Sequence, residues 1–425
     1  ARSPANPARS ATTPAAGSRP ACPRTRINLR GGRRMEERCV PTRHSRHHDL
    51  TTKKKSEAMK LNDGLVASLK YYLPLNKSRL TCLAGMLLSL LRLKQVNLTQ
   101  LALAFSSEAT PQSRYRRLQR FFAEVVFNYD HIAQLIMSLF DFEEHGYYLA
   151  LDRTNWQWGK TDINFLTLAV VYQGVAIPVY WLVLNKKGNS NQRERICLIH
   201  RFIRQFGRDN IKGILADREF IGSEWWSWLT ENEIPFFIRI KQNQCVINQH
   251  KQPLSHLFRD LVVGQKRYLR KPRLVGQTDV YLSGLRLETG ELLIVASNIA
   301  CATPMDVYAL RWQIEHLFQC LKGRGFHFEE MHLTHYFRIK KMMALLAIAL
   351  AWAHKVGEWQ HKAIKPLAIK KHGRLEKSFF RYGLDYLTDC LLHHQADIEC
   401  SLRLLFLFFL TPDKIRPNDK MSNTS

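Results

Sequence analysis

The 425-residue sequence lacks an apolar run long enough to cross a membrane, which needs about 20 such residues. Its longest apolar stretches, Met342–Trp352 and Leu404–Leu410, are too short, and we expect both to form buried helices. The N-terminus has no apolar signal segment, which argues against export. None of the nine cysteines forms a Cys-x-x-Cys pair, which argues against a zinc ribbon or a disulfide framework. We therefore expect a cytoplasmic protein with no membrane partner.

Acidic residues are also scarce. The chain has 36 of them against 63 Lys and Arg, and its net charge is +27. Such an excess predicts a polyanionic partner. DNA, RNA and acidic membrane all fit, and we favour nucleic acid. Apolar residues make up 45% of the chain, enough for a substantial core, and its length predicts two or three domains.

Residues 1–58 differ in composition from the rest. They are rich in Ala, Pro, Ser and Arg, with 14 basic and 4 acidic residues and almost no apolar periodicity. This composition predicts a disordered basic leader. It is either an arm on DNA or a segment that is not native to the protein. A group of Cys and His residues in it lacks zinc-finger spacing, so we expect no metal there.

Residues 59–145 are predicted to form an all-helical DNA-binding domain. Helices are expected at Leu80–Leu93, Leu98–Phe105 and Thr110–Phe122, and the last begins with a Thr-Pro pair, a favourable helix start. Two short helices with basic residues on the second resemble a helix-turn-helix. A helical bundle with a solvated basic face is the alternative. The basic residues are Arg114, Arg116, Arg117 and Arg120.

From residue 146 the pattern changes to short apolar strands. Three strands with tight connections, then alternating helices and strands, predict a mixed α/β sheet whose order resembles the ribonuclease-H-like fold. We expect the first part of this domain at 146–241. Its strands are predicted at Tyr147–Leu151, Asn164–Tyr172, Ala176–Leu184, Gly213–Ala216 and Pro235–Ile240, and its helices at Gln192–Phe206 and Ser223–Asn232.

A β-rich insertion, residues 242–302, interrupts this domain. Thr289-Gly290 is predicted to be a hairpin turn between two of its strands, Val280–Leu287 and Leu292–Ser297. The second part of the domain, 303–358, is expected to begin with a helix at Pro304–Lys322. C-terminal helices and a tail follow at 359–425. A late basic cluster there either follows a DNA backbone or forms a solvated face: Lys370, Lys371, Arg374, Lys377 and Arg381.

Two carboxylates follow apolar strands. Asp152 comes directly after Tyr147–Leu151, and Asp217 comes after Gly213–Ala216. Ligands of α/β folds bind at such strand ends, and two neighbouring carboxylates could share hard cations. One such Asp is common and carries little meaning; the pair is suggestive.

A third carboxylate lies on the predicted helix at Pro304–Lys322. At about 100° per residue, four polar side chains share a strip about 60° wide on one face. A solvated charged face is the bland alternative. One acid among two bases and a tyrosine is, however, the composition expected where a metal ligand lies beside a phosphate. The four residues are Tyr308, Arg311, Glu315 and Lys322.

Here the sequence resembles the insertion sequence 4 family of DDE transposases. That family has the pattern Y-x2-R-x3-E-x6-K, which the four residues of the strip match. Leu151-Asp152-Arg153-Thr154, followed by Trp156, is similar to its first motif, and Ala216-Asp217-Arg218-Glu219-Phe220 to its second. The resemblance covers residues from about 80 to about 410.

The resemblance implies a triad of Asp152, Asp217 and Glu315 that binds two Mg²⁺ or Mn²⁺ ions. Two metals can activate an attacking oxygen and stabilise a leaving one. Arg311 and Lys322 would hold phosphates.

Other side chains are given roles by the same resemblance or by their positions beside the triad. Tyr308 would bond a phosphate or stack near a flipped base, and Trp156 or Trp312 would help to hold a DNA hairpin. Glu219 is not expected to touch metal, and His316 is expected to pack rather than to support Glu315.

The implied activity is cut-and-paste transposition. The protein would bind the terminal inverted repeats of an insertion sequence, cleave there and join the 3′ ends to target DNA. It would act as a dimer on double-stranded DNA at the bacterial nucleoid. A DNA-binding protein without cleavage, a related nuclease and a catalytically decayed transposase are the alternatives.

Overall fold

The computed structural model describes residues 61–140, 142, 146–247, 251–371 and 373–393. The predicted leader at 1–58 and the predicted helix at Leu404–Leu410 lie outside the described residues. Within the described ranges, no helix combines the length and the apolar character that crossing a membrane requires.

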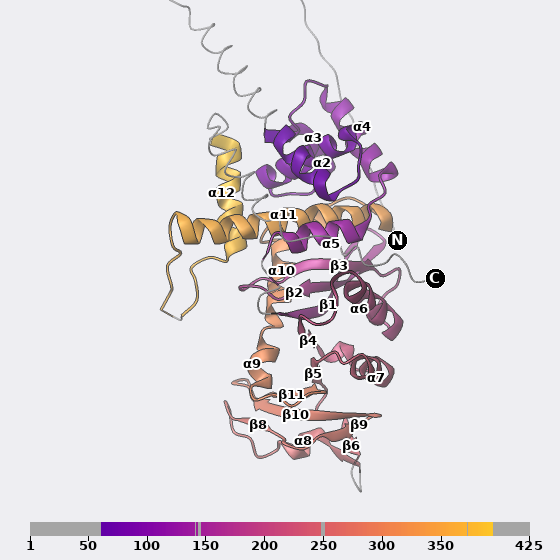
Figure 1. Ribbon diagram of the computed structural model, residues 1–425, viewed down its shortest axis with the longest axis vertical. Helices are drawn as coiled ribbons and strands as arrows, with labels where there is room; N and C mark the ends of the chain where they lie inside the picture. Colours follow the sequence, from indigo (N-terminus) through magenta and orange to yellow (C-terminus); the bar gives the residue numbers. More distant parts are fainter. Residues whose placement is uncertain (1–60, 141, 143–145, 248–250, 372, 394–425) are drawn as a thin grey trace, which may run out of the picture. The chain divides into compact units, whose positions relative to one another are not determined.

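The strands of the described residues form one mixed sheet (Figure 1). Its order is β3-β2-β1-β4-β5-β11-β10-β9-β6-β7, and β8 pairs with β10. The β3–β2 and β2–β1 pairs are antiparallel, whereas β4 runs parallel to β1 and β5 runs parallel to β4. The predicted mixed α/β sheet is therefore confirmed. The strands are β1 (Tyr147–Trp158), β2 (Thr161–Val170), β3 (Ile177–Val183), β4 (Ile211–Ala216), β5 (Phe236–Ile240), β6 (Cys245–Ile247), β7 (Lys251–Pro253), β8 (Lys266–Tyr268), β9 (Arg273–Val275), β10 (Thr278–Arg286) and β11 (Leu292–Ser297).

The first strand is longer than predicted. β1 was expected to end at Leu151, but its second half pairs with β2 in a hairpin that reaches Trp158↔Thr161. Its parallel pairing with β4 stops at Leu151↔Ala216. Asp152 therefore does not end its strand, as the sequence predicted. It lies instead where β1 leaves β4, while Asp217 does follow the last residue of β4.

The strands between residues 242 and 302 extend the central sheet. The predicted turn at Thr289-Gly290 is confirmed, since β10 and β11 pair as a hairpin around it. Gly290 has a φ of 81°, a left-handed conformation that glycine adopts without strain. β11 pairs antiparallel with β5, so the inserted strands continue the same sheet instead of standing apart from it.

Helices between the strands begin and end close to their predicted limits. α6 spans Gln192–Phe206, as predicted, because Asn191 and Glu194 form a capping box at its start. α7 spans Ser223–Glu231 and α8 spans Leu254–Leu257. Short 3₁₀ turns, η1 and η2, span Arg218–Phe220 and Phe328–Glu330.

The helix predicted at Pro304–Lys322 is broken in two. α9 spans Pro304–Ala309 and α10 spans Trp312–Leu321. Between them Arg311 N donates to Tyr308 O at 3.0 Å, a tighter 3₁₀-type bond. The break occurs where the Arg311 side chain bonds Asp152 on β1. The prediction of one continuous helix face was wrong because this distant partner does not show in the local pattern.

The N-terminal helices are α2 (Lys77–Leu93), α3 (Leu98–Ala104), α4 (Pro111–Glu124) and α5 (Tyr129–Ser138). Asn97 caps α3, and Thr110 caps α4 with proline at its first position, so the predicted helix starts are confirmed. All-helical structure is thus present in this region, and its predicted DNA-binding role remains a prediction.

Of the two C-terminal helices, α11 lies between the N-terminal helices and the sheet (Figure 1). α11 (Tyr336–Ala363) packs on β3, α5 and α2, and α12 (Phe379–His393) packs on α11 and α2. Gly383 permits a close helix crossing, since a Cβ there would lie 1.9 Å from the Ala353 carbonyl oxygen. α12 is also joined to the end of α2, where Lys94 Nζ lies 3.1 Å from Asp385.

Candidate active site

Two aspartates lie next to the point where the pairing of β1 with β4 ends. The last parallel pair is Leu151↔Ala216, and the next residue on each strand is Asp152 or Asp217. Each carboxylate accepts a hydrogen bond from the backbone N–H of the residue that follows it. Two rigid backbone positions therefore present neighbouring carboxylates.

The Asp152 carboxyl has a pKa raised to about 6. Burial is the main cause, because water no longer stabilises the charged form. The positive charge of Arg311 opposes the rise, and the negative charges of Asp217 and Glu315 add to it. The three carboxylates predicted as a triad therefore act electrostatically on one another.

Arg311 joins two of these carboxylates. Its Nη1 donates to Asp152 Oδ2 at 3.1 Å, and its Nη2 donates to Glu315 Oε1 at 2.6 Å. The arginine is only 6% exposed. A buried guanidinium thus neutralises one carboxylate on β1 and one on α10. Arg311 and Asp152 are 159 residues apart in the sequence.

The three carboxylates offer oxygen ligands to a metal. Carboxylate oxygens are the ligands that Mg²⁺ and Mn²⁺ prefer, so the donor chemistry fits hard divalent cations. In the part of the chain that the structure describes, however, no group of three His, Cys, Asp or Glu residues is arranged around a metal position. Arg311 instead holds Asp152 and Glu315. A cation would have to take over oxygens that now accept from this arginine.

Glu219 has partners other than the triad. Arg153 Nε lies 3.0 and 3.1 Å from its two carboxylate oxygens. Ser190 also donates to Glu219 through its backbone N–H and its hydroxyl. The sequence analysis did not single out Arg153 or Ser190. The available signal was that Arg153 and Glu219 each lie within two residues of a candidate aspartate.

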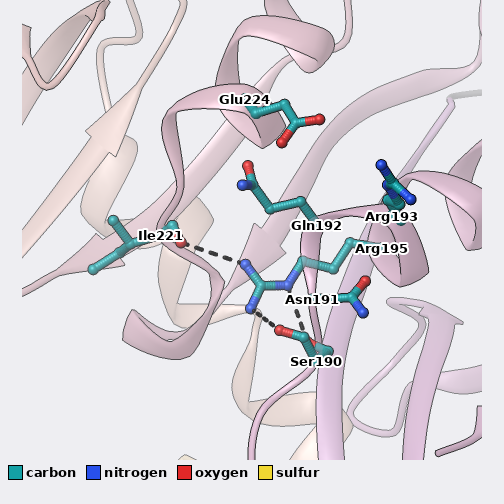
Figure 2. A pocket seen from close by; sticks show the side chains of 7 residues that line it. All are labelled: Ser190, Asn191, Gln192, Arg193, Arg195, Ile221 and Glu224. Atoms are coloured by element: carbon teal, nitrogen blue, oxygen red, sulfur yellow. Dashed lines mark hydrogen bonds between the residues drawn. The ribbon is translucent and has the colours of Figure 1, made fainter.

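A pocket of about 580 Å³ lies beside this network (Figure 2). Figure 2 shows the Arg195 side chain turned toward Ser190 and the backbone of Ile221. Arg195 donates to Ser190 O at 2.7 Å and to Glu219 O at 3.0 Å. Because its guanidinium bonds these internal acceptors, the arginine joins the start of α6 to the segment after Asp217. The pocket is lined by Ser190, Asn191, Gln192, Arg193, Arg195, Ile221 and Glu224.

Lys322 lies away from Arg311, at the end of α10. Its Nζ is 2.9 Å from Glu329 and 5.1 Å from the centre of the Trp156 ring. Trp156 itself stacks on Phe165, with ring centres 5.8 Å apart, and is packed against the core. The structure therefore brings Arg311 and Glu315 together with Asp152 but places Lys322 against a packed tryptophan.

The aromatic residues next to Arg311 differ in exposure. Trp312 is 57% exposed, whereas Tyr308 is 4% exposed. The Tyr308 hydroxyl is buried and makes no hydrogen bond within the described residues. Burial raises its pKa to about 12, against the opposing charge of Arg311.

His316 Nδ1 lies 2.8 Å from the Gly174 carbonyl oxygen, so His316 contacts a loop, not Glu315.

The arginines of α4 fall into two pairs. Arg114 donates to Phe105 O at 2.6 Å, and Arg117 donates to Ser78 O at 3.0 Å. These two side chains join α4 to the end of α3 and the start of α2. Arg116 and Arg120 are exposed and lie one helical turn apart. In the late basic cluster, Lys377 and Arg381 both pair with Asp385.

Comparison with known families adds to this geometry. Residues 144–352 match the family model described as the transposase DDE domain. This segment is therefore similar to a transposase DDE domain. It runs from the start of β1 into α11 and contains all three candidate carboxylates.

The chain also aligns with a solved transposase structure. A cryo-EM structure of a piggyBac transposase synaptic complex with hairpin DNA aligns with 82% of this chain and 79% of its own, at 12% identity. The TM-score of this alignment is 0.41. No curated protein matches the chain.

Proposed function

We propose that the protein is a cut-and-paste transposase of the insertion sequence 4 family, with a ribonuclease-H-like catalytic domain. It would bind terminal inverted repeats as a dimer on DNA, cleave there and join the 3′ ends to target DNA. The observation that carries the proposal is the meeting of Asp152 and Glu315 at buried Arg311, inside the DDE domain and beside Asp217. A protein that only bound DNA would have no need for a cluster of partly buried acids near a polyanion.

The proposed roles follow from the side-chain chemistry. Asp152, Asp217 and Glu315 would hold two Mg²⁺ or Mn²⁺ ions, which when bound supply Lewis acidity at the attacking and leaving oxygens. The two-armed guanidinium of Arg311 matches a phosphate as well as the carboxylates that it now bonds. Arg311 would therefore orient a phosphate next to the carboxylates.

The side chains proposed to contact DNA differ in their exposure to solvent. Of the two tryptophans considered for a DNA hairpin, Trp312 has the exposed ring. We therefore assign base stacking to it and not to the packed Trp156. Lys322 and Tyr308 would reach DNA only if Lys322 left Glu329 and the segment that buries Tyr308 opened.

The test is nicking of DNA that carries the element's own terminal repeats, with Mg²⁺ or Mn²⁺ present. We expect the full-length protein to release 3′-OH ends and Glu315→Gln to bind the same DNA without cutting it. Glu330→Gln changes a 62% exposed glutamate and is the matched control, which should cut like the unaltered protein. If the unaltered protein binds and never cuts with either metal, it is a DNA-binding protein or a decayed transposase, and the proposal fails.

The helical region gives a second test. Arg116→Ala with Arg120→Ala should weaken DNA binding and lower the slope of log Kd against log salt by about 2, because each phosphate contact contributes about one unit. The melting temperature should not change, since both side chains are exposed. The control is Arg114→Ala with Arg117→Ala, which removes hydrogen bonds between helices and should lower the melting temperature. Equal salt slopes for the exposed-pair variant and the unaltered protein would show that α4 does not bind DNA through this face.

A further inference from the structure

An ion pair lies just beyond the two aspartates. Arg153 follows Asp152 on β1, and Glu219 lies two residues after Asp217 in η1. Arg153 Nε approaches both oxygens of the Glu219 carboxylate, at 3.0 and 3.1 Å. The side chains are only 15% and 17% exposed. The pair therefore joins the two aspartate-bearing segments in a place where water is largely excluded.

The pair lies where the backbone no longer connects these segments. Parallel pairing of β1 with β4 ends at Leu151↔Ala216. Beyond that point β1 pairs with β2, while the chain after Asp217 turns into a three-residue 3₁₀ helix. Asp152 and Asp217 also repel each other as like charges. Their separation therefore depends on side chains that bridge the gap between the segments.

Internal partners hold Arg153 in one orientation. Its Nη1 donates to Asn164 Oδ1 at 3.1 Å, and its Nη2 lies 3.4 Å from Asn189 Oδ1. Asn164 is 2% exposed and donates in turn to the Gly188 carbonyl oxygen at 2.9 Å. The Arg153 nitrogens already donate to these groups. We therefore do not expect Arg153 to bind a phosphate.

The Glu219 carboxylate is held in the same way. Besides Arg153, it accepts from the Ser190 backbone N–H at 3.2 Å and from the Ser190 hydroxyl at 3.3 Å. Arg195, itself buried, donates to the Glu219 carbonyl oxygen at 3.0 Å. A carboxylate with four internal contacts is built to position its backbone, and its oxygens are not aimed at a cation.

We propose that the Arg153–Glu219 pair is a positioning clamp that sets the separation of Asp152 and Asp217 and so the affinity of the site for divalent cations. The inference rests on the proposed function, since it gives those aspartates a metal to bind. Neither residue of the clamp touches metal or DNA. Each acts through the aspartate next to it, as groups that orient metal ligands do in other metalloenzymes.

The experiment measures Mn²⁺ binding to the full-length protein by isothermal titration calorimetry. Glu219→Gln keeps the shape of the side chain and removes its charge. Arg153→Gln with Glu219→Gln removes both charges and leaves neither unpaired, which guards against simple misfolding. Both variants should bind Mn²⁺ about 10- to 100-fold more weakly, the range found when groups that orient metal ligands are changed.

Nicking provides the second readout. The Mn²⁺ concentration for half-maximal nicking should rise by the same factor, and saturating Mn²⁺ should restore the rate. A merely structural role would not give that rescue. The control is Arg208→Gln with Glu233→Gln, which removes an Arg–Glu pair 2.7 Å long and exposed, near the opposite end of β4. It should change neither readout.

The outcomes distinguish a failure of the proposed clamp from a failure of the proposed function. If both clamp variants bind Mn²⁺ like the unaltered protein, or if saturating Mn²⁺ does not restore nicking, the clamp is wrong. Asp152→Asn would still lose Mn²⁺ binding in that case, and the proposed function would stand. If the unaltered protein neither binds Mn²⁺ nor nicks DNA, the proposed function itself fails.

Discussion

Arg311→Ala should lower the nicking rate by about 10²–10³-fold, the loss seen when one positioned donor is removed from an active site. The same change should tighten Mn²⁺ binding to the free protein. Arg311 now donates to Asp152 and Glu315 at 3.1 and 2.6 Å, so it competes with any cation for their oxygens. Removing it leaves a more negative site, which attracts a divalent ion more strongly.

The pH of this measurement matters because of Asp152. Burial already raises its pKa to about 6, and Arg311 is the charge that opposes the rise. Without Arg311 the carboxyl would keep its proton to a higher pH, and protons would compete with Mn²⁺. The comparison is therefore made at about pH 8, well above the pKa of about 6, to reduce the competition from protons.

Arg311→Lys is the matched variant. It keeps the positive charge but loses the planar fork that bonds two acceptors at once. We expect nicking to fall as well, while Mn²⁺ affinity stays close to that of the unaltered protein. Weaker Mn²⁺ binding in Arg311→Ala would mean that the arginine holds the carboxylates in place for the metal. A normal nicking rate in Arg311→Ala would show that Arg311 does not orient the phosphate.

Local sequence signals predicted much of the fold. The limits of α6 follow from the capping box of Asn191 and Glu194, and the start of α4 follows from Thr110 and the proline after it. The end of β4 before Asp217 follows from a short apolar run. Each of these signals involves residues a few positions apart, so the sequence displays them directly.

Features that depend on distant partners were not predictable in this way. β1 continues past Asp152 because β2 pairs with it, although Arg153–Trp158 is a polar and aromatic stretch without the usual apolar run. The break before α10 coincides with the bond from Arg311 to Asp152, 159 residues away. The repeat of about 100° per residue placed Lys322 with Arg311, but the end of α10 turns it to Glu329.

The candidate carboxylates were predicted from the sequence, but their surroundings were not. A strand followed by Asp, together with the family resemblance, identified Asp152 and Asp217. Nothing in the local pattern separated Arg114 and Arg117, which bond backbone oxygens, from exposed Arg116 and Arg120. Which arginine of a helix is structural depends on the helices packed against it.

His354 should make the fold sensitive to acid. The residue lies on α11 with no exposed surface, and neither ring nitrogen has a hydrogen-bond partner within the described residues. The aromatic rings of Phe140, Tyr172 and Phe379 lie 5.9, 5.6 and 5.8 Å from its centre. Burial lowers its pKa to about 4, although nearby Glu358 favours the proton.

The direction of the effect follows from proton binding in the two states. In the unfolded chain His354 takes up a proton below about pH 6.5, whereas in the folded protein it remains neutral down to about pH 4. Between these values the unfolded state binds one proton more, so stability falls as the pH falls. At 1.36 kcal/mol for each pH unit, the loss from pH 6.5 to pH 4 is about 3 kcal/mol.

Urea unfolding from about pH 6.5 to about pH 4 measures this loss, with His354→Leu compared to the unaltered protein. The leucine cannot take up a proton, so the variant should lose about 3 kcal/mol less over this range, whatever its stability at neutral pH. His200→Leu changes an exposed histidine and should leave the pH dependence unaltered.

Hydrogen exchange of α11 amides would show whether the acid effect is centred on this helix. Equal slopes of stability against pH in His354→Leu and the unaltered protein would mean that His354 is protonated in the folded state, with Glu358 compensating its burial.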